Sequence, residues 1–151
     1  MAAPRKLNRD IWVGATPTAA MIVQLARFGI KSVICNQDDR EDIRVLTSAQ
    51  CEKVAKRLGL GYAQAIVEDR MKVTEQEVER FKKAYDALPK PVFVYCRAGY
   101  RASLVWALSQ LPAHEIDTLV EEVFDVGYDL TLVGRPQLEA RLQKLQMESK
   151  K

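Results

Sequence analysis

Short apolar runs alternate along this chain with segments whose apolar residues recur at helical spacing, and this alternation limits the possible fold more than any other feature. Strands that alternate with helices favour a mainly parallel sheet, covered by helices and joined by right-handed crossovers. We therefore expect an α/β three-layer sandwich with a four- to five-stranded sheet. The expected strands are 11–13, 31–35, 62–67 and 92–95, and the expected helices are 16–29, 48–59, 74–89, 102–111, 112–126 and 136–147.

The length of the chain sets the number of domains. Its 151 residues, 48% of them hydrophobic, suffice for one packed core but not for two comfortable ones. We expect a single domain over 1–151, with its core at about 7–142 and a flexible tail at 147–151.

Composition and charge indicate the compartment and the partners. The longest uncharged stretch, 11–26, is too short and too polar to span a membrane. Asn8, Arg9 and Asp10 separate the basic residues of 1–6 from any apolar segment, so we expect no secretory signal. Three cysteines without metal-ligand spacing fit a reducing compartment. A net charge of +3, spread among acidic residues, gives no support to nucleic-acid binding. We expect a cytoplasmic protein that needs no membrane, nucleic acid, metal or cofactor; its oligomeric state is left open.

The segment 92–101, VFVYCRAGYR, carries the chemistry. Its continuous apolar run is typical of a central strand buried on both faces. Where such a strand turns sharply into a helix, the amides of the turn and the positive end of the helix dipole point at the first side chain, here Cys96. Gly99 allows close approach of a bound group, and Arg101 can hold anionic oxygens with its planar guanidinium. This field favours a reactive thiolate; the alternative is a small buried apolar cysteine.

CRAGYR, together with IWVGATPTAAMIVQLARFGIKSVICNQDDRED and DVGYDLTLVGRP, resembles the bacterial beta-lactamase-hydrolase-like phosphatase domain family over roughly 7–142. That family is related in fold to dual-specificity and tyrosine phosphatases, and some of its members are described as sulfurtransferases. The resemblance implies a cysteine-phosphatase-like fold, with Cys96 as nucleophile and Arg101 as the anion-binding arginine. It also implies that the anion lies on the loop formed by Arg97, Ala98, Gly99 and Tyr100.

The loop departs from the pattern of tyrosine phosphatases. Tyr95 replaces their histidine, four residues instead of five separate Cys96 from Arg101, and Ala102 occupies the place of a hydroxyl residue that helps the thiolate to leave. The shorter spacing resembles that of rhodanese-type sulfurtransferases, whose narrower loop holds a persulfide. We therefore favour transfer of sulfane sulfur through a Cys96 persulfide. The alternative is hydrolysis of phosphate monoesters through a phosphocysteine, and a third possibility is a non-catalytic anion-binding or thiol-redox module.

A phosphatase also needs a carboxylic acid that protonates the leaving oxygen. Asp69 is the best candidate and Glu68 the second, because both follow a strand expected to end at the same edge of the sheet as Cys96. A solvated loop carboxylate is the alternative for Asp69. The substrate is expected to be a small anion or thiol, with a protein thiol or a phosphoprotein as further options.

Other residues near the expected site have two interpretations each. The acidic loop 38–42 either borders the pocket or is a solvated turn. Cys35 is either a resolving thiol or a buried structural cysteine. The ring of Tyr100 either forms a wall of the pocket or is simply exposed.

Overall fold

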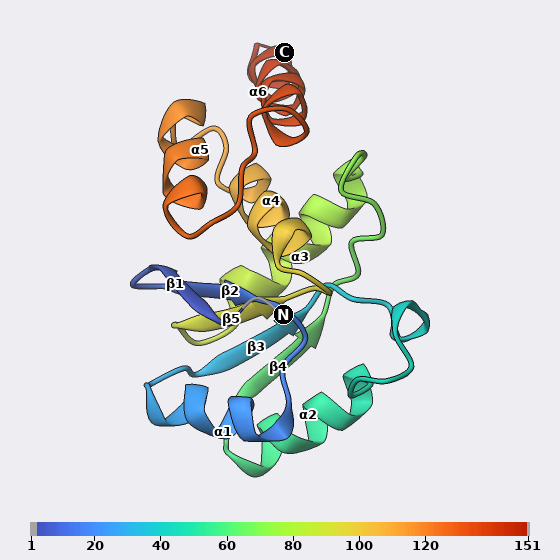
Figure 1. Cartoon of the computed structure of the whole chain (residues 1–151). Coiled ribbons are helices and arrows are strands. Elements are labelled where there is room, and N and C mark those ends of the chain that lie inside the picture. Colours follow the sequence, from blue (N-terminus) through green and yellow to red (C-terminus); the bar gives the residue numbers. More distant parts are fainter. Residues whose placement is uncertain (1–2, 151) are drawn as a thin grey trace.

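The computed structural model describes residues 3–150 (Figure 1). Residues 1–2 and 151, which belong to the basic N-terminal segment and the expected tail, lie outside the described residues. The elements are, in order, β1 (Arg5–Asn8), β2 (Ile11–Gly14), α1 (Ala19–Arg27), β3 (Ser32–Cys35), the 3-10 helix η1 (Asp39–Glu41), α2 (Ser48–Arg57), β4 (Gly61–Gln64), α3 (Glu75–Ala87), β5 (Val92–Tyr95), α4 (Tyr100–Ser109), α5 (Ile116–Asp125) and α6 (Gly134–Ser149).

The strands form one sheet of five in the order β1-β2-β5-β3-β4. Strands β2, β5, β3 and β4 are parallel, and β1 pairs antiparallel with β2 at the edge. The prediction of a mainly parallel sheet is confirmed. The sequence does not predict β1, because this short, partly exposed edge strand has one apolar residue, Leu7, and therefore no apolar alternation to reveal it.

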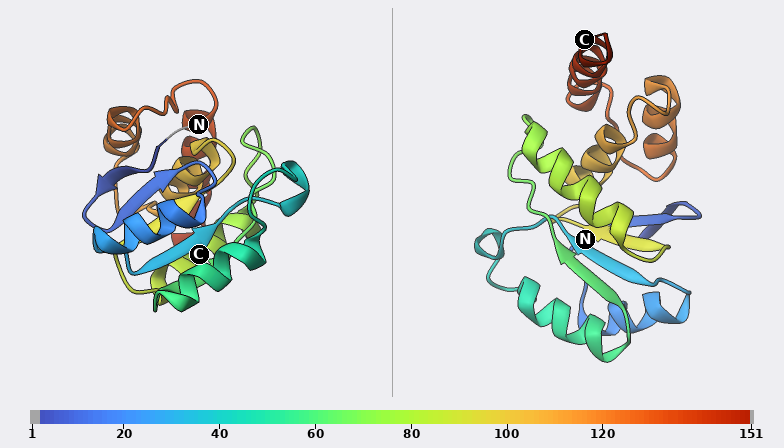
Figure 2. Two further views of the ribbon diagram at one scale, coloured as in Figure 1. Left: turned by 60° about the horizontal axis from the view of Figure 1, so that its bottom comes forward. Right: turned by 180° about the vertical axis from the view of Figure 1, so that it is seen from behind.

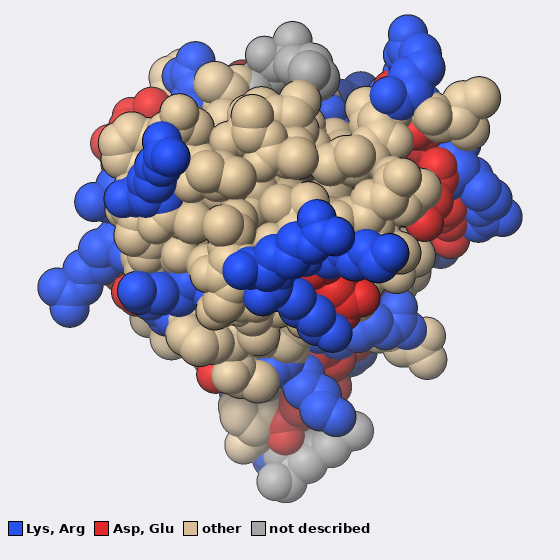
Figure 3. Space-filling model, turned by 90° about the horizontal axis from the view of Figure 1, so that it is seen from below, with Lys and Arg blue, Asp and Glu red and all other residues tan. Residues whose placement is uncertain are grey.

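Helices cover both faces of the sheet. Figures 1 and 2 show α1 and α2 on one face and α3 and α4 on the other, with α5 and α6 packed outside α4. On the outer side of α1 and α2, Lys and Arg side chains lie next to Asp and Glu side chains, and wide uncharged areas separate these groups (Figure 3). The layers agree with the predicted three-layer sandwich.

The central strand β5 divides the core into two clusters. Val92 and Val94 belong to the cluster under α3 and α4, whereas Phe93 and Tyr95 belong to the cluster under α1 and α2. Because side chains alternate along a strand, the next residue, Cys96, returns to the first cluster.

Several element boundaries differ from those expected. β4 ends at Gln64 rather than at 67, although the amides of Ala65 and Val67 still donate to the carbonyls of Cys35 and Asn36 at 2.8 and 3.0 Å. α4 begins at Tyr100 and α6 at Gly134, each before the expected residue. α6 also continues to Ser149, so most of the expected tail is helical. Within residues 3–150, none of the helices combines the length and the apolar character that crossing a bilayer requires.

Candidate active site

Cys96 lies directly after β5, at the edge where the parallel strands end. Its amide donates to the carbonyl of Gly14, the last residue of β2, at 3.3 Å. The side chain is only 1% exposed and packs on the α4 side of the sheet. The thiol therefore lies between the sheet and the start of α4, as the sequence predicts.

The loop after Cys96 places a backbone amide on the sulfur. The Gly99 amide donates to Sγ of Cys96 at 3.0 Å. Gly99 has a φ of 96°, a conformation that other residues rarely adopt, and it caps α4 at its N-terminus. The first amides of a helix have no carbonyl partner within it, so they are available to an anion at this position. The loop can thus stabilise negative charge on the sulfur or on a group attached to it.

Ser103 forms a hydrogen bond with the backbone of this loop. Its hydroxyl is buried and donates to the carbonyl of Gly99 at 3.0 Å. The hydroxyl therefore supports the loop backbone. Ala102, where a hydroxyl residue is absent by comparison with tyrosine phosphatases, is fully buried.

Arg101 is fixed by an acidic side chain and by the backbone. Its Nη1 and Nη2 atoms donate to the two carboxylate oxygens of Glu41 at 2.9 and 2.5 Å, and Nη1 also donates to the carbonyl of Val67 at 2.6 Å. A guanidinium has five N–H groups, so Nε–H and one Nη2–H remain for another anion. The hydrogen bonds with Glu41 raise the pKa of Arg101, burial opposes this, and negative charge on Cys96 raises the pKa further. The Arg101 guanidinium and an anion at Cys96 therefore stabilise each other electrostatically.

Glu41 is a site residue that the sequence did not single out. Burial acts to raise the pKa of its carboxyl, but the hydrogen bonds from Arg101 and from the Asp38 amide outweigh burial, so that the pKa lies below its ordinary value. The Asp38 amide donates to Oε2 of Glu41 at 2.9 Å, which closes a capping box around η1. The loop 38–42 thus borders the site, and its acidic character is the sequence signal for this role.

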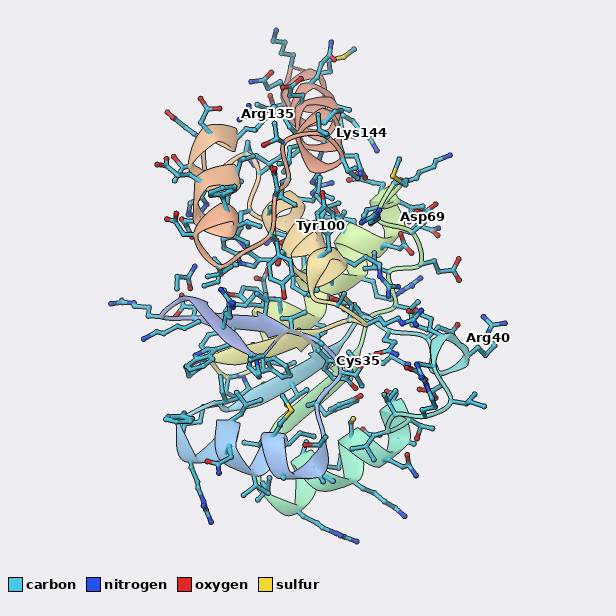
Figure 4. The ribbon with its side chains drawn as sticks, in the orientation of Figure 1. Cys35, Arg40, Asp69, Tyr100, Arg135 and Lys144 are labelled. Carbon is cyan, nitrogen blue, oxygen red and sulfur yellow. The ribbon has the colours of Figure 1, made fainter. Side chains whose placement is uncertain are left out.

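An open cavity of about 570 Å³ is lined in part by Arg101. Arg40 is at the outer tip of its loop (Figure 4) and pairs with Asp38 at 2.7 Å. Arg97 is exposed, makes no ion pair within residues 3–150, and also lines a neighbouring cavity of about 430 Å³. The cavity therefore presents both acidic and basic side chains, and Arg97 is the arginine in its lining without an ion pair within residues 3–150. The cavity is lined by Asp38, Arg40, Glu41, Glu68, Arg97 and Arg101.

The two candidate acids differ in placement. Glu68 lines the cavity. Asp69 is exposed on the loop between β4 and α3 (Figure 4), and its Oδ1 accepts the amide of Met71 at 2.8 Å, within its own turn. The placement favours Glu68, and the role of Asp69 stays a prediction.

Tyr100 is not among the residues that line this cavity. It is half-buried against the main core cluster and lies 5.6 Å from the Arg70 guanidinium. Ala98 is exposed at the tip of the loop. Within residues 3–150, no group of three His, Cys, Asp or Glu side chains is arranged to hold a metal ion.

Tyr128 is a second residue that the sequence did not single out. It follows α5, and its hydroxyl lies so close to the α carbon of Gly99 that a β carbon there would overlap with it. It is part of the segment DVGYD, in which no spacing or charge pattern indicates chemistry.

Comparisons with known proteins agree with this geometry. The family profile described as "Beta-lactamase hydrolase-like protein, phosphatase-like domain" matches residues 4–113. A beta-lactamase hydrolase-like protein from Xylella fastidiosa (strain Temecula1) is 25% identical over 139 residues, which cover 88% of this chain. Those residues cover 32% of that relative, so the chain spans about a third of its length.

Solved structures show the same fold. The crystal structure of a candidate phosphatase from Neisseria meningitidis Z2491 has a TM-score of 0.81 and 29% identity, and the match covers 93% of this chain and 99% of that one. The structure of PTPMT1 in complex with PI(5)P has a TM-score of 0.76 and 16% identity, covering 97% of this chain and 99% of that one. The expected cysteine-phosphatase-like fold and the family resemblance are confirmed. The matches support the phosphatase alternative and give no support to sulfur transfer, which the sequence analysis favoured.

Proposed function

Because this chain belongs to the family of beta-lactamase hydrolase-like, phosphatase-like domains, we propose that it is a phosphatase that hydrolyses phosphate monoesters through a phosphocysteine at Cys96. One observation carries the proposal. The Cys96 sulfur accepts the Gly99 amide at the N-terminus of α4, beside a guanidinium that Glu41 holds in place. This arrangement concentrates donors where a phosphoryl group attached to sulfur would carry its charge.

The reaction has two steps. The Cys96 thiolate attacks phosphorus, the sulfur–phosphorus bond forms, and the phosphorus–oxygen bond to the leaving group breaks. A carboxylic acid gives its proton to the leaving oxygen, and Glu68 is the better-placed candidate because it lines the cavity. A water molecule, activated by the resulting carboxylate, then attacks phosphorus, which releases phosphate and restores the thiolate.

The donors divide the charge between them. The amides of the loop and the first turn of α4 face the equatorial oxygens, together with the Nε–H and the remaining Nη2–H of Arg101. Glu41 does not act as the acid, because its bonds with Arg101 lower its pKa and keep it ionised. Its role is to hold Arg101.

Sulfur transfer is the second candidate, and the spacing of four residues between Cys96 and Arg101 favours it. In that reaction the thiolate attacks the outer sulfur of thiosulfate, releases sulfite and forms a persulfide, which an acceptor thiol discharges. No acid is required, so changes at Glu68 and Asp69 distinguish the two reactions.

The cavity indicates the class of substrate. Because Arg97 has no ion pair within the described residues and lies between two cavities, a substrate with a second anionic group next to the phosphate fits best. The structural neighbour PTPMT1 was crystallised with the phosphoinositide PI(5)P. A phosphoinositide therefore belongs in the substrate panel beside phosphotyrosine and phosphothreonine peptides.

The decisive experiment compares two activities on one preparation. Hydrolysis of para-nitrophenyl phosphate is measured beside transfer of sulfur from thiosulfate to cyanide, with Cys96→Ser and the matched control Cys51→Ser, which changes a buried cysteine in the other core cluster. We expect hydrolysis that requires Cys96 and tolerates the control. Cys96-dependent sulfur transfer without hydrolysis would replace the phosphatase proposal by the second candidate.

A further inference from the structure

Tyr128 has a buried hydroxyl without a partner. Among the described residues, four buried side-chain oxygen atoms accept or donate no hydrogen bond: Asn36 Oδ1, Tyr100 OH, Glu122 Oε2 and Tyr128 OH. Buried hydroxyl groups are normally satisfied, so an exception calls for a function or an unseen partner. Of these four atoms, the Tyr128 hydroxyl lies against the loop of the proposed nucleophile.

The fold brings Tyr128 to this position from a distant part of the chain. After α5, Gly127 adopts a φ of 101°, and the Tyr128 amide donates to the carbonyl of Val123 at 3.2 Å. The turn directs the ring to the loop, where its hydroxyl meets the α carbon of Gly99. The amide of the same Gly99 donates to the Cys96 sulfur. The phenol and the thiol are therefore next to the same residue.

The surroundings keep this phenol protonated. Burial raises the pKa of Tyr128, and negative charge on Cys96 raises it further, whereas the Arg5 guanidinium opposes both effects. At neutral pH the group is therefore an O–H donor beside a site of negative charge. A donor in a buried environment stabilises a nearby anion more strongly than it does in water.

We propose that Tyr128 is a positioning residue of the active site, whose buried hydroxyl is directed across Gly99 and stabilises the anionic form of Cys96. The inference takes from the proposed function only the identity of the nucleophile. It assigns a role to the segment between α5 and α6, which lies outside the matched residues 4–113. A ring that served packing alone would fill the same space without its hydroxyl.

The pH dependence of alkylation tests the proposal. The rate at which iodoacetamide modifies Cys96 is measured from pH 5 to pH 10 by peptide mass mapping, in the wild-type protein and in Tyr128→Phe. We expect the midpoint of the rate profile to move upward by about 0.5 pH unit, because the variant removes a buried dipole close to the anion without breaking a direct hydrogen bond. An unchanged midpoint in Tyr128→Phe would overturn the proposal.

Two further variants separate this effect from a loss of packing. Tyr62→Phe removes a partly buried hydroxyl beside the opposite core cluster, where it contacts Ser48 at 2.7 Å, and is expected to leave the midpoint in place. Tyr128→Leu removes ring and hydroxyl together and is expected to shift the midpoint as Tyr128→Phe does. An equal shift in Tyr62→Phe would also contradict the inference, because it would show a general effect of destabilisation.

The assay does not depend on catalysis. If the wild-type protein hydrolyses no phosphate monoester but the midpoint shifts in Tyr128→Phe, the phosphatase proposal fails and the role of Tyr128 stands. If hydrolysis occurs and the midpoint does not shift, the reverse holds.

Discussion

Cys35 is the last residue of β3, and Cys96 directly follows the neighbouring parallel strand β5. The two cysteines therefore lie at the same edge of one sheet, yet they have different surroundings. β3 and β5 are paired so that Cys35 lies beside Tyr95, one residue before Cys96. Both side chains are 1% exposed. They differ in face: Cys35 packs under α1 and α2, and Cys96 under α4. Burial is thus the same for the two thiols, and their chemistry follows from the groups on each face.

Hydrogen bonds show the difference. The Cys35 thiol donates to the carbonyl of Gln37 at 3.3 Å, which requires its proton, and burial raises its pKa. The Cys35 sulfur also accepts the Gln37 amide at 3.4 Å, whereas the Cys96 sulfur accepts the Gly99 amide at the N-terminus of α4 and, among the described residues, donates to no carbonyl. A resolving role for Cys35 would need a path through the sheet to the opposite face. The comparison teaches that neither burial nor one donor on the sulfur sets Cys96 apart; what differs is its place in the loop at the N-terminus of α4, which ends in Arg101.

Replacing each cysteine by serine is the strongest test of the proposed difference between Cys96 and Cys35. We expect Cys96→Ser to lower kcat/KM for para-nitrophenyl phosphate roughly a thousand-fold or more, because it removes the nucleophile. Cys35→Ser is expected to keep activity within about three-fold, and to lower stability by about 1 kcal/mol, since it places a more polar group in a core cluster. Steady-state kinetics and thermal unfolding measure both. Similar losses of activity in the two variants would contradict the assignment.

The proposed phosphatase reaction needs a carboxylic acid near Cys96 that protonates the leaving oxygen. We expect Glu68→Gln to lower kcat about 100-fold for alkyl phosphates and less for para-nitrophenyl phosphate, whose leaving group needs little protonation. Asp69→Asn serves as the matched change, and its effect is expected to be smaller because the Asp69 carboxylate is held by the Met71 amide. Kinetics on both substrates decide between them. A larger effect of Asp69→Asn would restore Asp69 as the acid, and no effect of either would remove both.

Glu41 binds Arg101, which belongs to the loop of Cys96, and Cys35 has no hydrogen bond with an arginine among the described residues. We expect Glu41→Gln to lower kcat/KM about 10- to 100-fold through loss of charge-assisted hydrogen bonds to Arg101. Arg40→Gln, which removes an exposed member of the same loop, is the control and is expected to cost much less. Unchanged kinetics in Glu41→Gln would show that Arg101 holds its position without this partner.

The lowered pKa of Glu41 predicts a small effect of pH. The contribution of the Glu41–Arg101 pair to stability is complete above the ordinary carboxyl pKa of 4.5, and it is lost as the pH falls through the lowered pKa in the folded state. The free energy of unfolding is therefore expected to fall more steeply below pH 4.5 in the wild-type protein than in Glu41→Gln. Urea unfolding between pH 3 and pH 6 measures this, and parallel curves would contradict it.

Local patterns made part of this structure predictable. The apolar run of β5 and the segment CRAGYR are continuous in sequence, so the buried central strand, the turn and the position of Cys96, the proposed nucleophile, could be predicted before the fold was known. The parallel sheet followed from the alternation of strands and helices. Features that depend on neighbouring residues in the sequence could therefore be predicted.

The partners of the loop come from distant segments and could not be predicted in the same way. Glu41 is 60 residues before Arg101, and an acidic loop has no periodicity that reveals which carboxylate faces inward. Tyr128 reaches Gly99 only because α5 packs outside α4. Glu68 and Asp69 follow a strand that ends at Gln64, and in the intervening loop the alternation of faces no longer indicates which side chain meets the cavity.

The spacing of the loop and the family match favour different functions. Four residues between Cys96 and Arg101 favour sulfur over phosphate, whereas the family whose profile covers this loop is phosphatase-like. In the folded protein the position of Arg101 depends on Glu41 and Val67 as well as on the loop. Loop length alone is therefore a weak measure of which anion the site accepts.

The most direct test of the account is the mass of the covalent intermediate. The protein is mixed with para-nitrophenyl phosphate, quenched in acid within milliseconds, and its peptides are mapped by mass spectrometry. The account predicts one phosphoryl group on the peptide that contains Cys96 and none on the peptide that contains Cys35. No phosphoryl adduct under these conditions, together with a one-sulfur adduct on Cys96 after thiosulfate, would contradict it.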